Sequence, residues 1–469
     1  MRTRTQLYLL ASCFTAFGLA WLFNGQGVIR DDPDRNIAIP DELIVPLQVR
    51  AAYNGDRIFF QYRWPAQRPH VIHDIVKYEN AKWVTYGEGN PGPEKHGIHE
   101  DRVAMMVDDG SVPEFARYGG YITIGQGLDS FSGQITGAAL DAHPLGQKHG
   151  VITKYLPATR TDASDWSTVV ADSRLKAQRE AGYFLDLWHW RAGRSNPVGK
   201  ADDQHVAEDR GSDSGKATFA TNWDKEKKQP KYMFNPAKAG KEHLRWDDVG
   251  PQRVSFDGDY YLTTDNLVPF DANHPWEDGD VLPRRYLQSG EGSRADIAVE
   301  GRGHWQDGYW TVTLARAMDT GNPTEDKVFR DGGTYPVAFA IHRHATGLRW
   351  HYVSLPLTVG LDREADFAAA RFTGATPSWD QPWHNVKLFY PGQVNWPLLT
   401  STRHAGAEMI RKGIPVRFRH SEEQLTRYGV EAEFMDEIIQ QWRFTLLAGL
   451  LLFAGLGFGL TVLQKKGGE

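Results

Sequence analysis

Two uncharged apolar segments stand near the two ends of the chain, with a long polar and aromatic stretch between them. Residues 7–23 read LYLLASCFTAFGLAWLF, and residues 444–463 read FTLLAGLLLFAGLGFGLTVL. A helix of about 20 apolar residues is long enough to cross the hydrocarbon core of a bilayer. Both segments are therefore predicted to be transmembrane helices.

Basic residues predict how these helices are oriented. Arg2 and Arg4 precede the first segment, and Lys465 and Lys466 follow the second. Positive residues favour the cytoplasmic side, so we expect both termini in the cytoplasm and the middle of the chain in the periplasm of a bacterial inner membrane. A cleaved signal peptide, or a lipoprotein signal ending at Cys13, are alternatives. An uncleaved signal anchor is favoured because the apolar run continues past Cys13.

The middle of the chain alternates apolar and polar positions with the period of two that is typical of strands. Residues 43–53 and 57–64 flank Asn54-Gly55-Asp56, a pattern typical of a β-hairpin. Further strands are predicted at residues 101–107, 309–315, 337–341 and 351–359, and at residues 254–262 with a turn at Asp257-Gly258-Asp259. Short strands separated by turns predict an all-β antiparallel sandwich with loop and helical insertions, flanked by the N- and C-terminal transmembrane helices.

Two stretches interrupt the alternation. Residues 126–182 are predicted to be an insertion with a short helix near residues 173–180, and residues 194–250 a long polar loop or partly mobile segment. Helices are predicted at residues 404–412 and 421–441, leading to Trp442 at the membrane interface. The predicted order is a signal anchor (1–35), the sandwich (36–362), a helical extension (363–442), a membrane helix (443–464) and a tail (465–469).

Composition narrows the chemistry. Cys13 is the only cysteine and lies in the first apolar segment, so the exported part has no disulfide, thiolate metal site, iron–sulfur cluster or C-x-x-C-H attachment of covalent haem. The net charge of −6 gives no sign of nucleic-acid binding. No nucleophile elbow, P-loop or H-E-x-x-H helix is present.

Five segments in order carry a family resemblance. They are residues 49–64, 99–105, 186–192 with the sequence D-L-W-H-W-R-A, 310–316 and 336–354. This order resembles the haem-binding domain of the ethylbenzene dehydrogenase gamma subunit and the related cytochrome c-552 and DMSO reductase-like haem-binding family. The resemblance implies a periplasmic β-sandwich that transfers electrons through one non-covalent b-type haem. It also implies that catalysis belongs to a separate molybdenum subunit, so we expect no substrate turnover by this chain alone.

The chain departs from that family in one respect. Membrane-anchored relatives carry covalent haem motifs near the segment that corresponds to residues 118–124 and after a helix that corresponds to residues 404–407. Neither place has a cysteine here. His420 is interpreted either as the surviving histidine of such a motif or as a surface histidine.

His351 is the first candidate axial ligand. It shares a strand face with Val353 and Leu355 and is expected to point inward. The resemblance implies a lysine ligand just before the residue equivalent to Ser354, and His351 is a chemically suitable replacement. The alternative is a buried histidine hydrogen-bonded to the backbone.

Other candidates come from two strands. His189 lies between Trp188 and Trp190, on the opposite strand face, and these rings suit either a porphyrin wall or a packed core. Met105 and Met106 are candidate ligands or plain core residues, although the resemblance places the methionine nearer residues 119–127. The candidate partners of the haem propionates are Arg191 and Arg194, with exposed surface arginines as the alternative.

Two functions of different kinds remain open. One is a membrane-anchored b-type cytochrome that relays electrons between a periplasmic redox protein and the membrane. The other is a haem-free sandwich that binds carbohydrate or a partner protein through exposed aromatic rings.

A metal site at His96, His99, Glu100 and Asp101, or at His342 and His344, is less favoured than a solvated loop. Asp202, Asp203 and His205 are interpreted as solvated loop residues.

Overall fold

The computed structural model describes most of the chain. The described residues are 10–19, 44–87, 96–122, 135, 137–147, 151–162, 165–250, 254, 256, 258–342, 351–389 and 435–466. The chain divides into two compact units, of which the larger comprises Pro40–Pro391 and Asn395–Pro397. The smaller comprises Met1–Ile39, Gly392–Val394 and Leu398–Glu469.

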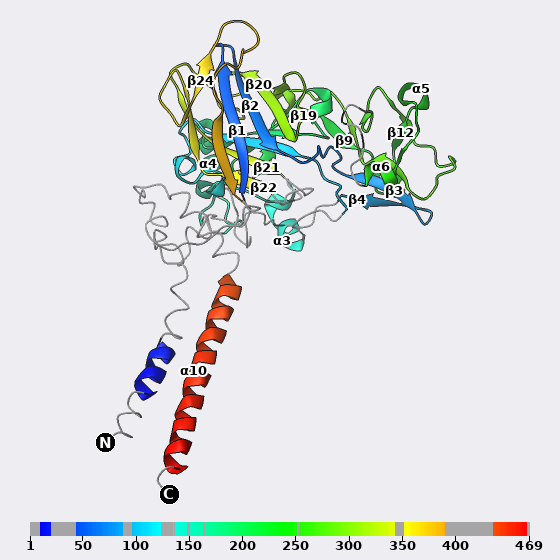
Figure 1. Cartoon of the computed structure of the whole chain (residues 1–469). Coiled ribbons are helices and arrows are strands. Elements are labelled where there is room, and N and C mark those ends of the chain that lie inside the picture. The colour runs from blue at the N-terminus through cyan, green and yellow to red at the C-terminus, as the bar shows by residue number, and fades with distance from the viewer. Residues whose placement is uncertain are drawn as a thin grey trace. The chain divides into compact units, whose positions relative to one another are not determined.

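Strands dominate the larger unit (Figure 1). Fourteen of them form one sheet: β1 (Ile44–Tyr53), β2 (Arg57–Pro65), β5 (Arg102–Val107), β6 (Leu185–Arg191), β7 (Asp202–Val206), β8 (Arg210–Ser212), β18 (Ala298–Val299), β19 (His304–Gln306), β20 (Tyr309–Ala317), β21 (Thr334–His342), β22 (His351–Ser354), β23 (Leu357–Leu361), β24 (Phe367–Arg371) and β25 (His384–Phe389). The smaller sheets are built from β3 (Ile75–Glu79), β4 (Lys82–Tyr86), β9 (Phe219–Thr221), β10 (Trp223–Asp224), β11 (Gln229–Pro230), β12 (Tyr232–Phe234), β13 (Leu244–Arg245), β14 (Leu262–Thr263), β15 (Leu267–Pro269), β16 (Asp280–Pro283) and β17 (Arg285–Leu287).

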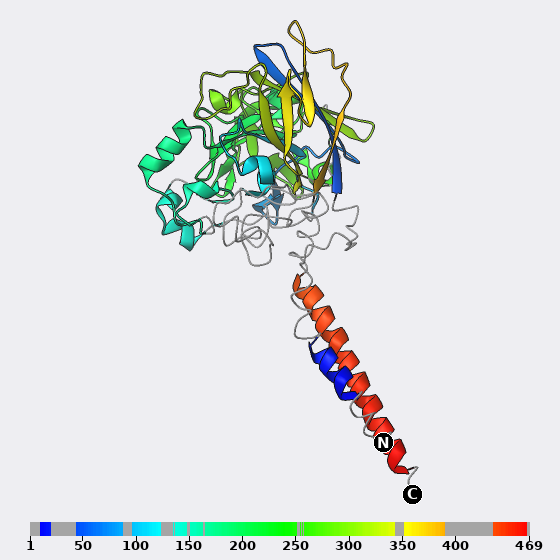
Figure 2. The ribbon, with the colours of Figure 1, turned by 90° about the vertical axis from the view of Figure 1, so that its left-hand side faces the viewer.

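The helices of this unit are short. They are α2 (Phe115–Tyr118), η3 (Gly119–Ile122), α3 (Ala138–Asp141), η4 (Pro144–Gln147), η5 (Pro157–Thr159), α4 (Asp172–Glu180), η6 (Asn196–Val198), α5 (Pro236–Ala239), α6 (Trp246–Val249) and η7 (Ser293–Ala295). The predicted helix near residues 173–180 is confirmed by α4. In Figure 2 the teal segment with α3 and α4 lies at one flank of the unit.

The large sheet has the strand order β18-β20-β2-β1-β24-β23-β21-β5-β6-β7-β8 and is mostly antiparallel. The long strands β1 and β21 change partners along their length. β1 pairs first with β25 and then with β24, and β21 pairs first with β23 and then with β22. Because β22 pairs with β25 and β23 with β24, two connections join β1 to β21.

The two long strands therefore belong to layers that face one another. Phe60 on β2 contacts Trp188 on β6 with ring centroids 5.7 Å apart, although the two strands are far apart in the strand order. Trp64 and Trp190 meet in the same way at 5.8 Å. The aromatic core lies between the layers, so the structure is mostly antiparallel β with few helices and consistent with the predicted sandwich.

The first hairpin forms where the sequence predicts it. β1 and β2 pair antiparallel, with Ala52 opposite Phe59. Asn54 Oδ1 accepts hydrogen bonds from the amides of Asp56 and Arg57, and Gly55 has a φ of +96° that favours glycine. The predicted strands at residues 101–107, 309–315 and 337–341 are confirmed by β5, β20 and β21.

Two strand predictions need correction. Residues 351–359 form two strands, β22 and β23, because Pro356 between them has no amide to donate to a ladder. The described residues of 254–261 are bends, turns or irregular backbone, and regular structure begins with β14 at Leu262. Asp257 of the predicted turn lies outside the described residues.

The prediction of a long loop at residues 194–250 was wrong. This segment contains β7 to β13 together with η6, α5 and α6. Its polar residues are held in part by buried ion pairs: Asp203 on β7 contacts Arg316 at 2.7 Å, and neither side chain is exposed. Asp202 and Asp203 are therefore buried strand residues and not solvated. His205 lies on the same strand, and its side chain is mostly buried.

The smaller unit contains the two apolar helices. α10 (Met435–Lys466) includes Trp442–Gly459, a window with mean hydropathy 1.5 that is long enough to cross a membrane. The other described helix, Leu10–Leu19, is shorter than a membrane span, so one of the two predicted spans is found in the described part. The rings of Phe17 and Phe453 are in contact, with centroids 5.1 Å apart. The predicted helix at residues 404–412, His344 and His420 lie outside the described residues.

Candidate cofactor pocket

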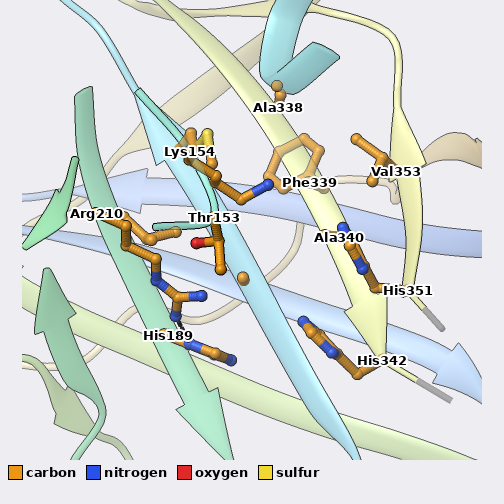
Figure 3. Close-up of a pocket in the computed structure, with 14 residues that line it drawn as sticks. Thr153, Lys154, His189, Arg210, Ala338, Phe339, Ala340, His342, His351 and Val353 are labelled. Carbon is orange, nitrogen blue, oxygen red and sulfur yellow. Dashed lines mark hydrogen bonds between the residues drawn. The ribbon is translucent and has the colours of Figure 1, made fainter. Parts of the chain in front are cut away.

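A pocket lies on the face of β6, β5, β21 and β22 that points away from the aromatic core (Figure 3). Its empty volume, which includes the open solvent at its mouth, is about 640 Å³. The lining is mainly apolar, with a few polar side chains. The residues that line the pocket include Ala104, Met106, Thr153, Lys154, Leu187, His189, Arg210, Ala338, Ala340, His342, His351 and Val353.

Strand alternation decides which residues reach the pocket. His189 and Leu187 line it, whereas Trp188 and Trp190 are fully buried in the core on the other face. Met106 lines it, whereas the sulfur of Met105 accepts a hydrogen bond from Tyr62 in the core at 3.3 Å. The predicted separation of His189 from its tryptophan neighbours is therefore seen in the strand β6.

Alanines form the sheet side of the pocket. Ala104 on β5 stands opposite Ala340 on β21, and Ala338 stands opposite Met106. A side chain of one carbon rises little above the sheet, while residues on the neighbouring strands are larger. The sheet face is therefore low and apolar where β5 meets β21, which suits a flat ligand.

Three imidazoles from three strands stand along this face. His342 and His351 are directly paired across β21 and β22, with ring centroids 4.9 Å apart and a tilt of 19°. His189 stacks beside His342 at 5.6 Å and 24°. All three side chains are buried, which keeps them away from bulk water.

Burial and charge keep two of these rings neutral. Desolvation lowers the pKa of His189 well below its usual range, and Arg191 and Arg210 lower it further. Desolvation likewise lowers the pKa of His342, with a smaller effect from Arg102. Both rings are neutral at pH 7, and neutral imidazole is the form that coordinates metals.

The hydrogen bonds of His189 fix its tautomer. Arg191 Nη2 donates to His189 Nδ1 at 3.1 Å, and Arg210 Nη2 donates to the same atom at 2.8 Å. Because Nδ1 accepts, the proton of the neutral ring belongs on Nε2. Nε2 is buried and has no hydrogen-bond partner among the described residues, and the same is true of His342 Nδ1.

The other side of the pocket comes from the insertion. Thr153 and Lys154 reach it from the segment before η5, and Lys154 is 8% exposed. Arg210 reaches it from β8, and burial lowers its pKa to about 9. Lys154 was not predicted, although a lysine inside the apolar run V-I-T-K-Y-L is a visible signal. Arg210 has no such signal, because its surroundings in the sequence are polar.

The remaining predicted residues are not among those that line the pocket. Arg191 is paired with Asp202 at 2.7 Å, and Arg194 is paired with Glu100 at 2.6 Å. The structure thus brings together His351, His189 and Met106 in one pocket. Met105, Trp188 and Trp190 belong to the core instead.

A second histidine group lies outside this pocket. His70, His99 and Asp101 are buried close together. The rings of His70 and His99 stack 4.0 Å apart with a tilt of 27°, and near-parallel rings do not direct their nitrogens at one ion. Asp101 Oδ2 already accepts hydrogen bonds from Trp310 Nε1 and the amide of His70. The group has the geometry of a packed and hydrogen-bonded core.

Comparison with known proteins identifies the family of the chain. A family model described as ethylbenzene dehydrogenase matches residues 25–354, which is most of the chain. The chain belongs to the ethylbenzene dehydrogenase family. Cytochrome c-552 of Stutzerimonas stutzeri is 31% identical over 94 residues, which are 20% of this chain and 30% of that protein. The chain therefore matches less than a third of this relative, and the ethylbenzene dehydrogenase resemblance is the better supported.

Proposed function

We propose that this chain is a membrane-anchored electron-transfer subunit that binds one b-type haem in the pocket on β6, β5, β21 and β22. The observation that carries the proposal is the combination of an alanine-lined flat face with three buried imidazoles in one mainly apolar pocket. The family and the similarity to a cytochrome support the same function.

The side chains present fit a haem bound without covalent attachment. His351, His342, Lys154 and Met106 offer nitrogen or sulfur ligands from the sheet and from the covering segment. His351 remains the first candidate ligand, and Lys154 is the candidate on the covering segment. Cys13 is the only cysteine, which leaves no C-x-x-C-H motif for a covalent link. A bound haem supplies one-electron transfer, while the protein excludes water and holds the ligands.

The wider setting of the proposal follows from the helices and the family. α10 is long and apolar enough to anchor the chain in a membrane. We propose that the larger unit lies in the periplasm, with both termini cytoplasmic, and exchanges electrons with an oxidoreductase partner. Substrate turnover would then belong to the partner and not to this chain.

Carbohydrate binding has less support. A sugar platform needs a row of exposed aromatic rings. In the described part of the larger unit, Tyr309 is the one exposed large aromatic side chain, and it is 37% exposed. No observation therefore favours the binding module over the haem protein.

Absorption spectroscopy of the detergent-purified chain tests the proposal. A Soret band with sharp α and β bands after dithionite reduction, a b-type pyridine haemochrome and a reversible redox titration are expected. His351→Ala should lower the haem content or change the spin state. The matched control His304→Ala alters an exposed histidine on β19 and should change neither. A featureless spectrum after expression with ample haem, and no uptake of added haemin, would overturn the proposal.

A further inference from the structure

One corner of the pocket has an arginine without a carboxylate. Arg210 forms no ion pair with any described residue; its Nη2 donates to His189 and, at 2.6 Å, to Gln204 Oε1. Its Nε donates to the same Gln204 oxygen at 3.1 Å. Gln204 and His189 thus hold the guanidinium at the pocket, while neither neutralises its charge.

The neighbouring carboxylates do not neutralise the charge of Arg210. Glu100 contacts Arg102 at 3.2 Å and Arg194 at 2.6 Å, and Asp202 contacts Arg191 at 2.7 Å and Arg294 at 3.0 Å. Each of the two carboxylates therefore already serves two arginines. Among the described residues that line the pocket there is no aspartate or glutamate. The excess of buried positive charge favours an anionic group in the pocket.

His189 supplies a second donor at this corner. Its Nδ1 accepts from two arginines, so Nε2 carries the proton and faces the pocket without an acceptor (Figure 3). A histidine that ligates iron through Nε2 needs the opposite tautomer, with Nδ1 donating to a neighbour. The arginines at Nδ1 prevent that arrangement.

The geometry points to a carboxylate-binding corner, in which Arg210 and His189 Nε2–H hold a propionate of the bound tetrapyrrole. This inference rests on the proposed function, because the carboxylate belongs to the cofactor. It assigns His189 to anchoring the cofactor and not to the iron. It also moves the propionate contact from Arg191 and Arg194, which are paired with Asp202 and Glu100, to Arg210.

Metal-free porphyrins separate the carboxylates from iron ligation. The full-length chain in detergent is titrated with protoporphyrin IX and with its dimethyl ester, and binding is followed by quenching of tryptophan fluorescence. The wild-type chain should bind the free acid about tenfold or more tightly than the ester, the effect expected of one lost charge-assisted hydrogen bond. Comparing the ratio of the two affinities between variants removes the ester's extra partition into detergent.

The variants assign the preference to the two residues. Arg210→Gln and His189→Phe should remove most of the preference for the acid, while His189→Gln, which keeps an N–H donor, should restore part of it. Arg210→Lys keeps the charge and tests the corner if the glutamine variant does not fold. Arg371→Gln, a change to an exposed arginine, is the control and should leave the ratio unchanged.

Each outcome bears on one of the two claims. Equal binding of acid and ester, or a ratio unchanged in both Arg210 variants, would overturn the carboxylate corner and leave the haem proposal standing. A shift of haem from low to high spin in His189→Phe with unchanged affinity would make His189 an axial ligand and also overturn it. Failure of both porphyrins and of haemin to bind would overturn the proposed function itself. If acetate competes with the free-acid porphyrin and accounts for its whole preference over the ester, the corner is a site for small anions only.

Discussion

Asp213 and His205 form a buried pair in which both groups are neutral near pH 7. His205 Nδ1 lies 2.5 Å from Asp213 Oδ1. Burial, with Asp186 and Asp326 nearby, raises the pKa of Asp213 to about 9, and burial lowers the pKa of His205 to about 4. A protonated carboxyl that donates to a neutral imidazole satisfies both groups without a buried charge.

This pair predicts that stability falls between pH 6.5 and 9. In that window the unfolded Asp213, whose usual pKa is 3.8, has lost its proton, while the folded residue keeps it. The unfolded chain then binds fewer protons, so the free energy of unfolding decreases as pH rises. Below pH 6.5 the unfolded His205 gains a proton that the folded one does not, which offsets the Asp213 effect down to about pH 4.

Asp213→Asn should flatten this dependence, because the amide imitates the protonated carboxyl but does not titrate. Urea unfolding followed by tryptophan fluorescence at several pH values measures the slope. Asp265→Asn changes an exposed carboxylate and serves as the control. An equally steep fall in Asp213→Asn would show that another group is responsible.

At the scale of elements, alternation in the sequence predicted the long strands and missed the short ones. β1, β2, β20 and β21 each run for nine or ten residues, which is enough for a period of two to be visible. β10, β11 and β13 are two residues long, and a pair of residues has no period. The same reasoning explains which pocket residues could be predicted. His351 and His189 lie on strands and were predicted, whereas Lys154 lies in irregular backbone and was not.

The two apolar helices of the smaller unit pack antiparallel through glycines. A side chain at Gly457 would meet Leu10, and one at Gly449 would meet Phe17, whereas a Cβ at Gly455 would have nothing within 4 Å. Small residues let helix backbones approach closely in a membrane. Residues later in the first helix contact residues earlier in α10, so the two described helices run antiparallel.

Cysteine cross-linking tests this contact. In a Cys13→Ser background, Leu10→Cys with Gly457→Cys should cross-link efficiently in membranes, and Leu10→Cys with the matched control Gly455→Cys should not. Gly449→Leu should weaken the first cross-link because it displaces Phe17. Equal cross-linking at both glycines would show that the helices have no fixed register. Absence of the first helix from the mature chain would remove the cross-link altogether.

The chain as a whole separates two kinds of apolar surface. The core of the larger unit is closed between facing strand layers, whereas most described side chains of α10 are exposed, among them Phe444, Leu451 and Phe458. The described residues that line the pocket all belong to the larger unit. Cofactor binding and membrane attachment are therefore expected to depend on different parts of the chain.

A chain without residues 1–39 and 398–469 tests this separation. It should be found in the soluble fraction after export with a cleavable signal. It should also keep the reduced b-type spectrum, because it retains each of the described residues that line the pocket. The comparison is made with the full-length chain in the same fractions, with circular dichroism to show that the strands are kept. A folded but haem-free truncated chain would mean that the smaller unit is needed to hold the cofactor. A truncated chain that still sediments with membranes would place a membrane contact in the larger unit. This outcome is the less expected one, because the described part of that unit has few exposed large apolar side chains, namely Val84, Val151 and Tyr309.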